Sequence, residues 1–275
     1  MGKLKTSMLL RYLVVLVVAL FVVIVTNAKT SIGMSLWTYT RIAPLATLVS
    51  PNDPALQFAI GNYYFGGGAY DVEKAQGYFQ KALEIDPKLE GAHYQLGRTY
   101  FIQSAFYDAL REINKELELH PNFKRSYYMR GLVYGYTKHY AEAENDFKEF
   151  LKWKPKSWAG HNDLAWIYFM KGDYKNSATT AREGLKYVPN NVWLLNSLGV
   201  ALLNEGKLEE AKKALTDALA SASAMTPADW GRSYPGNNPS VYGDGLMAMK
   251  ASIKRNLELI AARSAKGTSV RDVQL

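Results

Sequence analysis

Four prolines recur at a fixed interval in the middle of the chain. They are Pro87, Pro121, Pro155 and Pro189, and each lies 34 residues after the one before it. Proline cannot donate the backbone hydrogen bond that continues a helix, and it pushes the preceding residue out of the α region, so each proline predicts the end of a helix. A fixed period of roughly 20 to 50 residues is typical of solenoids, in which each repeat stacks on its neighbours.

Small and large residues follow the same period. The pattern predicts two helices in each repeat. The first helix of one repeat contains Leu96-Gly97-Arg-Thr-Tyr100, and the next repeat has glycine and tyrosine at the matching positions, Gly131 and Tyr134. A small residue opens each second helix: Ala75, Ala109, Ala143, Ser177 and Ala211. A larger residue follows one turn later, at Phe79, Ile113, Phe147 and Leu215. Small positions let two antiparallel helices approach closely, and large ones fill the space beside them.

This combination of period, Leu-Gly-x-x-Tyr pattern and closing proline resembles the tetratricopeptide-repeat (TPR) family. The resemblance implies an all-α TPR helical-hairpin solenoid, with the first helix of each hairpin on a concave inner wall. We expect five repeats over residues 55–225, at 55–89, 90–123, 124–157, 158–191 and 192–225. The turn at Gly66–Tyr70 holds two extra residues, and Pro227 predicts a last second helix about one turn longer than the others.

The N-terminal residues 1–28 predict a transmembrane helix or signal anchor. The stretch Met8–Val25 carries Arg11 as its only charge, and about 20 apolar residues span a bilayer as a helix. We expect residues 8–27 to contact the membrane. The basic residues Lys3 and Lys5 predict a cytoplasmic N-terminus, which places the repeats outside the cytoplasm, on the periplasmic side of a bacterial inner membrane. A cleaved signal peptide is the alternative, with Thr26-Asn27-Ala28 as an imperfect cleavage site.

The segments that flank the repeats predict simpler structure. Residues 29–54 are expected as a linker that lies at the membrane interface or packs on the first repeat. Residues 226–243 are rich in proline, glycine and asparagine and predict a loop. Residues 244–264 predict a helix with one apolar stripe, which covers the last repeat or docks a partner. Residues 265–275 are expected as a tail.

Composition argues against several classes of function. The chain has no cysteine, which excludes disulfides and thiolate metal sites, and its four histidines match no metal-binding spacing. The net charge of +8 comes from lysines and arginines scattered among acids, which is typical of a solvated helical surface and not of a nucleic-acid interface. We therefore expect no metal, no cofactor, no nucleic acid and no catalytic activity.

The remaining face of each first helix predicts a partner-binding groove, because the small and tyrosine positions are used for packing. Its aromatic rings offer contact area, its amides suit a peptide backbone, and its arginines suit carboxylates. The candidate residues are Asn62, Tyr94, Arg98, Arg125, Tyr128, Asn162, Trp166, Trp193 and Asn196.

The expected function is a membrane-anchored scaffold that binds a protein or peptide in this groove, in the assembly, secretion or maturation of envelope proteins. The alternative is a non-catalytic structural subunit of a membrane complex that docks by its convex face or C-terminal helix. TPR co-chaperones hold acidic heat-shock tails with a lysine and asparagine clamp, but Phe58 and Gln95 stand at two of those positions. The sequence therefore argues against that clamp.

Overall fold

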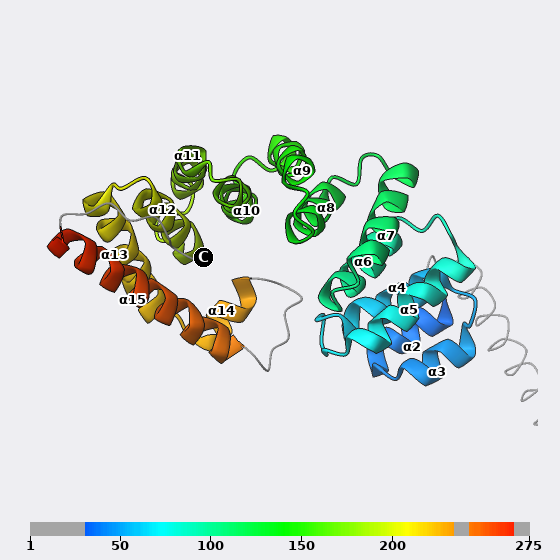
Figure 1. Ribbon diagram of the computed structural model, residues 1–275. Helices are drawn as coiled ribbons and strands as arrows, with labels where there is room; N and C mark the ends of the chain where they lie inside the picture. The colour runs from blue at the N-terminus through cyan, green and yellow to red at the C-terminus, as the bar shows by residue number, and fades with distance from the viewer. Residues whose placement is uncertain (1–30, 234–241, 267–275) are drawn as a thin grey trace, which may run out of the picture. The chain divides into compact units, whose positions relative to one another are not determined.

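The computed structural model describes residues 31–233 and 242–266, which form fourteen α-helices, α2 to α15, and no β-strand. The chain divides into two compact units between Ala92 and His93 (Figure 1). No helix within the described ranges is long and apolar enough to cross a membrane. The predicted membrane segment, residues 1–28, lies outside the described residues, as does most of the predicted tail.

The first unit begins with two helices where the sequence predicted a linker. They are α2 (Ile32–Thr40) and α3 (Ala43–Val49), followed by α4 (Pro54–Tyr64) and α5 (Val72–Ile85). The linker expectation for residues 29–54 is corrected, because this segment carries helix signals of its own. The hydroxyl of Ser31 caps α2 by accepting from the Met34 amide, and Trp37 is buried with apolar residues of α3 and α4. The segment thus packs on the first predicted repeat.

The turn between α4 and α5 contains the glycines that predicted an irregular loop. The amides of Gly67 and Gly68 donate to the carbonyls of Asn62 and Tyr63, at 3.0 and 3.2 Å. Gly66 has a φ of 109°, a conformation that a side chain disfavours. The extra residues therefore fold into a tight loop.

The second unit contains four helical hairpins, each made of a first and a second helix. The bounds are α6 (Ala92–Ile102), α7 (Phe106–Leu119), α8 (Arg125–Tyr136), α9 (Tyr140–Trp153), α10 (Trp158–Met170), α11 (Tyr174–Leu185), α12 (Val192–Asn204) and α13 (Leu208–Ala224). The second helices α7, α9, α11 and α13 begin 34 residues apart, which is the period that the prolines predicted. Helix α13 has 17 residues against 14 in α7 and α9, as expected from the late Pro227.

The predicted combination of small and large residues is found in the α6–α7 and α12–α13 hairpins. A Cβ added to Gly97 on α6 would lie 2.7 Å from Cγ1 of Ile113, and one added to Gly199 on α12 would lie 2.5 Å from Cγ of Leu215. Such distances are shorter than carbon atoms tolerate, so the first helix has no room for a side chain at these positions. The glycines therefore set how closely the two helices of a hairpin approach.

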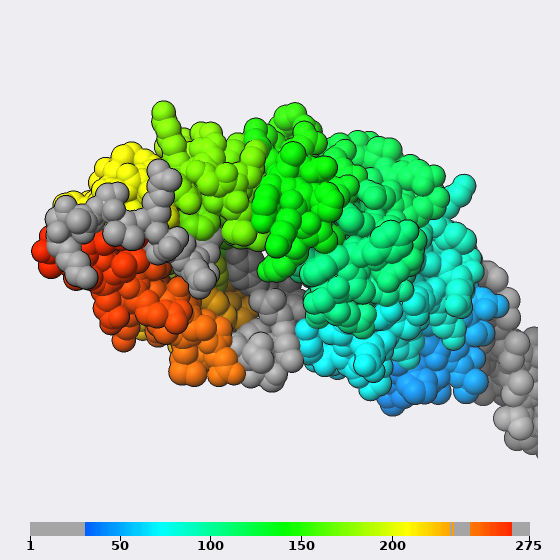
Figure 2. All heavy atoms as spheres, in the orientation of Figure 1, coloured from blue at the N-terminus to red at the C-terminus, as the bar shows by residue number. Residues whose placement is uncertain are grey.

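The C-terminal helices α14 (Pro227–Ser233) and α15 (Tyr242–Lys266) follow the last hairpin. Helix α14 corrects the prediction of a continuous loop over residues 226–243, because Asp229 accepts from the amide and hydroxyl of Thr226 at its start. Helix α15 buries Leu246, Ile253 and Ile260 in the core shared with α12 and α13. Helix α15 contacts α13, and its orange-to-red atoms are visible at the surface in Figure 2. Its apolar stripe is thus used within the chain.

Candidate partner-binding site

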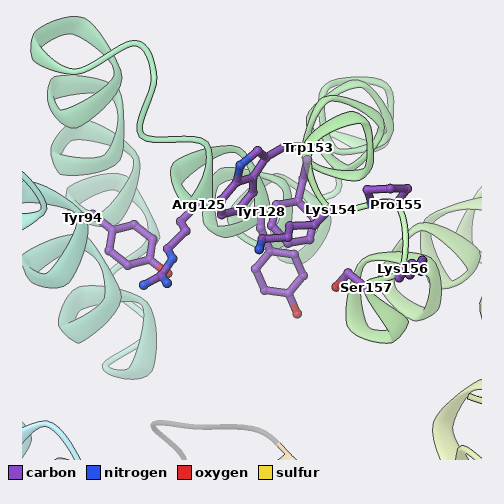
Figure 3. A pocket seen from close by; sticks show the side chains of 9 residues that line it. Tyr94, Arg125, Tyr128, Trp153, Lys154, Pro155, Lys156 and Ser157 are labelled. Atoms are coloured by element: carbon purple, nitrogen blue, oxygen red, sulfur yellow. The ribbon is translucent and has the colours of Figure 1, made fainter. Parts of the chain in front are cut away.

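Three of the nine predicted groove residues line one pocket of the second unit. Tyr94 comes from α6, and Arg125 and Tyr128 come from α8. The pocket has a volume of about 650 Å³. The rest of its wall comes from the end of α9 and the turn that follows it: Phe150, Trp153, Lys154, Pro155, Lys156 and Ser157. Figure 3 shows Arg125 extending toward Tyr94 on one side, with Lys156 and Ser157 on the other.

Ring contacts hold the aromatic part of the pocket in place. The ring of Tyr128 lies 4.9 Å from that of Phe150 and 5.7 Å from that of Phe147, centroid to centroid. The ring of Tyr94 lies 5.2 Å from that of Phe123. Aromatic pairs at these separations are favourable beyond the area that they bury. The pocket therefore has a preformed apolar wall.

The turn after α9 is shaped by backbone hydrogen bonds. The Lys154 amide donates to the Phe150 carbonyl at 2.9 Å and so ends α9, and the Ser157 amide donates to the Lys154 carbonyl at 3.0 Å. The Ser157 hydroxyl then caps α10 by accepting from the Gly160 amide at 3.2 Å. Pro155 sits inside this turn, so the proline that predicted the repeat also shapes the pocket.

The charge of the pocket is positive. Arg125, Lys154 and Lys156 line it, and none of its described lining residues is acidic. Among the ion pairs between described residues, none involves these three side chains. The ammonium of Lys154 lies 4.6 Å from the centroid of the Trp153 ring, a cation–π contact that keeps the charge beside an apolar surface. The pocket can thus attract a carboxylate and hold an apolar side chain next to it.

A buried carboxylate lies behind the pocket wall. The Tyr128 hydroxyl donates to Asp163 on α10, and the Asn162 side-chain amide donates to the same carboxylate at 3.0 Å. Burial raises the pKa of Asp163 to about 6, against the effect of these two donors. The hydrogen bond fixes the direction of the Tyr128 ring, so Asp163 positions a residue of the pocket.

The two asparagines predicted to face a groove are buried instead. Asn162 is 9% exposed and Asn196 is 8% exposed. The Ser197 hydroxyl on α12 donates to the Asn162 side-chain carbonyl at 2.9 Å. Asn162 and Asn196 lie on α10 and α12, which pack against each other, and the side-chain oxygen of Asn196 is buried there without a hydrogen-bond partner among the described residues. The expectation that Asn162 and Asn196 look into an open groove is corrected.

The predicted groove residue Trp193 is also buried, at 8% exposure. Its ring lies 5.1 Å from that of Trp158 on α10 and stacks at 4.7 Å on that of Trp230 on α14. The sequence did not place α14 here, because residues 226–243 predicted a loop. Trp193 thus joins α14 to the hairpins and is not available to a partner.

The other three predicted residues lie outside the pocket. The Arg98 guanidinium lies 5.7 Å from the Tyr94 ring centroid and donates to the Gln95 side chain, and burial lowers the pKa of Arg98. Trp166 is half-buried on α10 with its ring 5.4 Å from that of Tyr136. Asn62 is half-buried on α4 in the first unit.

The sequence prediction missed the part of the pocket that follows a second helix. It considered only first helices, because the family resemblance places the binding wall there. A local signal was present in the run Lys152-Trp-Lys-Pro-Lys156, which alternates basic residues with a ring and a proline. Elsewhere in residues 31–233 and 242–266, no group of three or more histidines and acids is placed to hold a metal ion.

Comparison with protein families supports the repeat assignment. Residues 128–192 and 194–224 each match a family model described as tetratricopeptide repeat. These matches cover the hairpins that form most of the pocket and the last predicted repeat. No curated protein matches the chain.

Several solved structures share the fold at low sequence identity. A tetratricopeptide-repeat protein from Parabacteroides merdae matches with 21% identity and a TM-score of 0.58, over 79% of this chain and 89% of that one. MamA from Desulfovibrio magneticus matches with 17% identity and a TM-score of 0.57, over 62% and 96%. YrrB, described as a TPR protein with an unusual peptide-binding site, matches with 16% identity and a TM-score of 0.54, over 66% and 93%. The described chain therefore shares the all-helical repeat fold of these structures, and two of its segments match tetratricopeptide-repeat models.

Proposed function

We propose that this tetratricopeptide-repeat protein is a non-catalytic scaffold that binds an acidic, partly aromatic segment of a partner protein. The observation that carries the proposal is the preformed pocket of Tyr94, Arg125, Tyr128 and Trp153, with its excess of positive charge. Its size is in the range of sites that enclose small ligands or a few side chains. YrrB, which shares the fold, has a peptide-binding site by its own description, and this supports a similar use of the repeats here.

The chemistry of the pocket defines the segment that it would accept. Arg125 and Lys154 suit a carboxylate, because charge-assisted hydrogen bonds to a guanidinium or an ammonium are stronger than neutral ones. The rings of Tyr128 and Trp153 suit a phenylalanine or leucine beside that carboxylate. A segment in which acidic and apolar residues alternate satisfies both requirements.

A peptide-binding measurement tests this function. The probe is a synthetic peptide in which glutamate alternates with phenylalanine, and its control has glutamine in place of glutamate. We expect Arg125→Glu with Lys154→Glu to weaken binding of the glutamate peptide on the order of tenfold or more, because two attractions become repulsions. The matched control is Lys175→Glu, an exposed lysine on α11 outside the pocket.

Two results would count against the function. One is equal affinity for the glutamate and glutamine peptides, since the charge would then have no role. The other is unchanged binding in the double charge reversal while circular dichroism shows intact helices. Both variants alter exposed side chains, so loss of the fold is not expected to confuse the outcome.

We also propose that residues 8–27 anchor the chain in a membrane and that the repeats lie outside the cytoplasm. The support is the apolar stretch Met8–Val25 with basic residues before it. Protease treatment of sealed spheroplasts tests the topology. The repeats should be digested from outside while a cytoplasmic marker stays intact, and protection of the repeats would contradict the proposed side.

A further inference from the structure

Exposed apolar side chains are concentrated on one small part of the first unit. Among the described residues, twelve large apolar side chains are exposed, and five of them fall within eleven residues of α2 and α3. The five are Tyr39, Ile42, Leu45, Leu48 and Val49. The other seven are spread singly between Ile102 and Met247. Scattered apolar residues are normal on a protein surface, but a cluster of them marks an interaction site.

Helix α3 has its small residues inside and its large residues outside. Ala43 and Ala46 are buried against the rest of the first unit. Leu45, Leu48 and Val49 follow one another at intervals of three and one residues, which puts them together on another face of the helix. Leu48 is 78% exposed. A helix on the surface of a soluble domain shows the opposite arrangement, with its large apolar residues buried. The outer face of α3 therefore has the composition of a face that contacts an apolar phase (its blue atoms lie at the surface in Figure 2).

The sequence that leads into and forms this face carries charge of one sign. No acidic residue precedes Asp53 in the chain, while basic residues occur before and within the segment. The basic residues are Lys3, Lys5, Arg11, Lys29 and Arg41. Arg41, between α2 and α3, lies 5.3 Å from the Trp37 ring centroid and remains exposed. An apolar face in a segment with basic and aromatic residues and no acid is typical of proteins that lie on an anionic lipid surface.

The position of the hairpin in the chain also selects a membrane as its partner. The apolar stretch ends at Val25, and the first described residue is Ser31. Six residues reach at most about 20 Å when fully extended. This step rests on the proposed anchor: if residues 8–27 lie in a bilayer, α2 and α3 are confined to the neighbourhood of its surface.

We propose that the α2–α3 hairpin docks on the surface of the lipid bilayer, with Ile42, Leu45, Leu48 and Val49 among the acyl chains nearest the headgroups. Tyr39 and Arg41 lie at headgroup level, where a phenol and a guanidinium are both well solvated. The first unit then rests on the membrane by two contacts, the anchor and this hairpin. A second contact with the bilayer restricts the orientation of the first unit more than a single anchoring segment does.

The absence of cysteine makes the test direct, since single cysteines can be introduced into the full chain. Leu48→Cys carries an NBD fluorophore, and the full chain is reconstituted in phosphatidylcholine vesicles with and without phosphatidylglycerol. Tyr107→Cys is the matched control, because Tyr107 is 82% exposed on α7 of the second unit. We expect lipids brominated near the headgroup to quench the probe at position 48 and not the probe at 107, more strongly with phosphatidylglycerol present.

Three other outcomes would overturn the docking of α2 and α3, and they differ in what they say about the anchor. If the chain floats with vesicles but the probe at position 48 is as open to aqueous iodide as the probe at 107, the docking is wrong and the anchor stands. If position 48 is shielded from iodide but not quenched by brominated lipid, protein covers the face, either residues 1–28 or a second copy, and the proposal is also overturned. If the chain does not float at all, both the anchor and the docking are rejected.

Discussion

At the scale of single residues, Gly97 shows most clearly what the repeat pattern requires. Its position on α6 leaves no space for a Cβ beside Ile113 of α7. We predict that Gly97→Leu destabilises the protein by about 1–3 kcal/mol or more, because the hairpin must open to admit the side chain. Urea denaturation followed by circular dichroism measures this change.

The matched control is Gly77→Ala on α5, where an added Cβ meets nothing within 4 Å. There alanine should stabilise the helix by roughly 0.5–1 kcal/mol, because glycine is the weaker helix former. If Gly97→Leu and Gly77→Ala changed the free energy of unfolding by the same amount, helix propensity would explain both results, and the close approach of α6 and α7 would not be needed.

The buried carboxylate of Asp163 predicts a specific pH dependence. Its folded-state pKa of about 6 lies above the ordinary value of 3.8 because burial disfavours the charged form. The stability that it contributes is therefore fully present below pH 3.8 and is lost as the pH rises through 6, by at most about 3 kcal/mol. We predict that the free energy of unfolding of Asp163→Asn relative to the unmodified chain rises between pH 4 and pH 7.

Denaturation of both chains across this range checks the prediction. The comparison of variant with unmodified chain removes the contributions of other titrating groups, such as Glu144, whose pKa is lowered to about 2. A difference that stays constant with pH would show that Asp163 is charged in the folded protein throughout.

At the scale of helices, Arg130 connects three of them. From α8 it donates to both carboxylate oxygens of Asp146 on α9, at 2.7 and 2.8 Å, and to the Asn114 side chain on α7 at 2.9 Å. Asp146 is 1% exposed, so removal of the arginine leaves a buried charge without its partner. We predict that Arg130→Ala costs about 3 kcal/mol in the free energy of unfolding.

The double variant Arg130→Ala with Asp146→Asn is the control for this interaction. It removes the charge as well as its partner, and it should recover part of the stability lost in the single variant. If Asp146→Asn lowers the free energy of unfolding as much in the Arg130→Ala variant as it does in the unmodified chain, the two residues act independently and the prediction is wrong.

Helices also show where sequence reasoning succeeded and where it did not. The repeat period was predictable because it is visible in the sequence, and the small and large positions, such as Gly97 and Ile113, were predictable because they depend on contacts within one hairpin. The burial of Asn162 and Asn196 was not, because it depends on how α10 packs on α12. Helix α3 was missed because seven residues with alanine inside and leucine outside produce no apolar stripe directed at a core.

At the scale of the whole chain, the proposed membrane contacts and the proposed partner-binding pocket belong to different units. The apolar stretch and the α2–α3 hairpin belong to the first unit, and the basic aromatic pocket belongs to the second. The pocket was only partly predictable, because it needs α6, α8 and the end of α9 together. Its first-helix residues Tyr94, Arg125 and Tyr128 were predicted, whereas Trp153 and Lys154 come from a neighbouring element.

Site-specific photocrosslinking in native membranes is the strictest test of whether a partner protein binds in this pocket. A benzoylphenylalanine replaces Trp153 in the pocket or, as a control, the exposed Tyr107 on α7. We expect a discrete crosslinked product from position 153 alone, which the glutamate–phenylalanine peptide competes away and which Arg125→Glu with Lys154→Glu abolishes. The same products from both positions, or a product at 153 that survives the charge reversal, would contradict it.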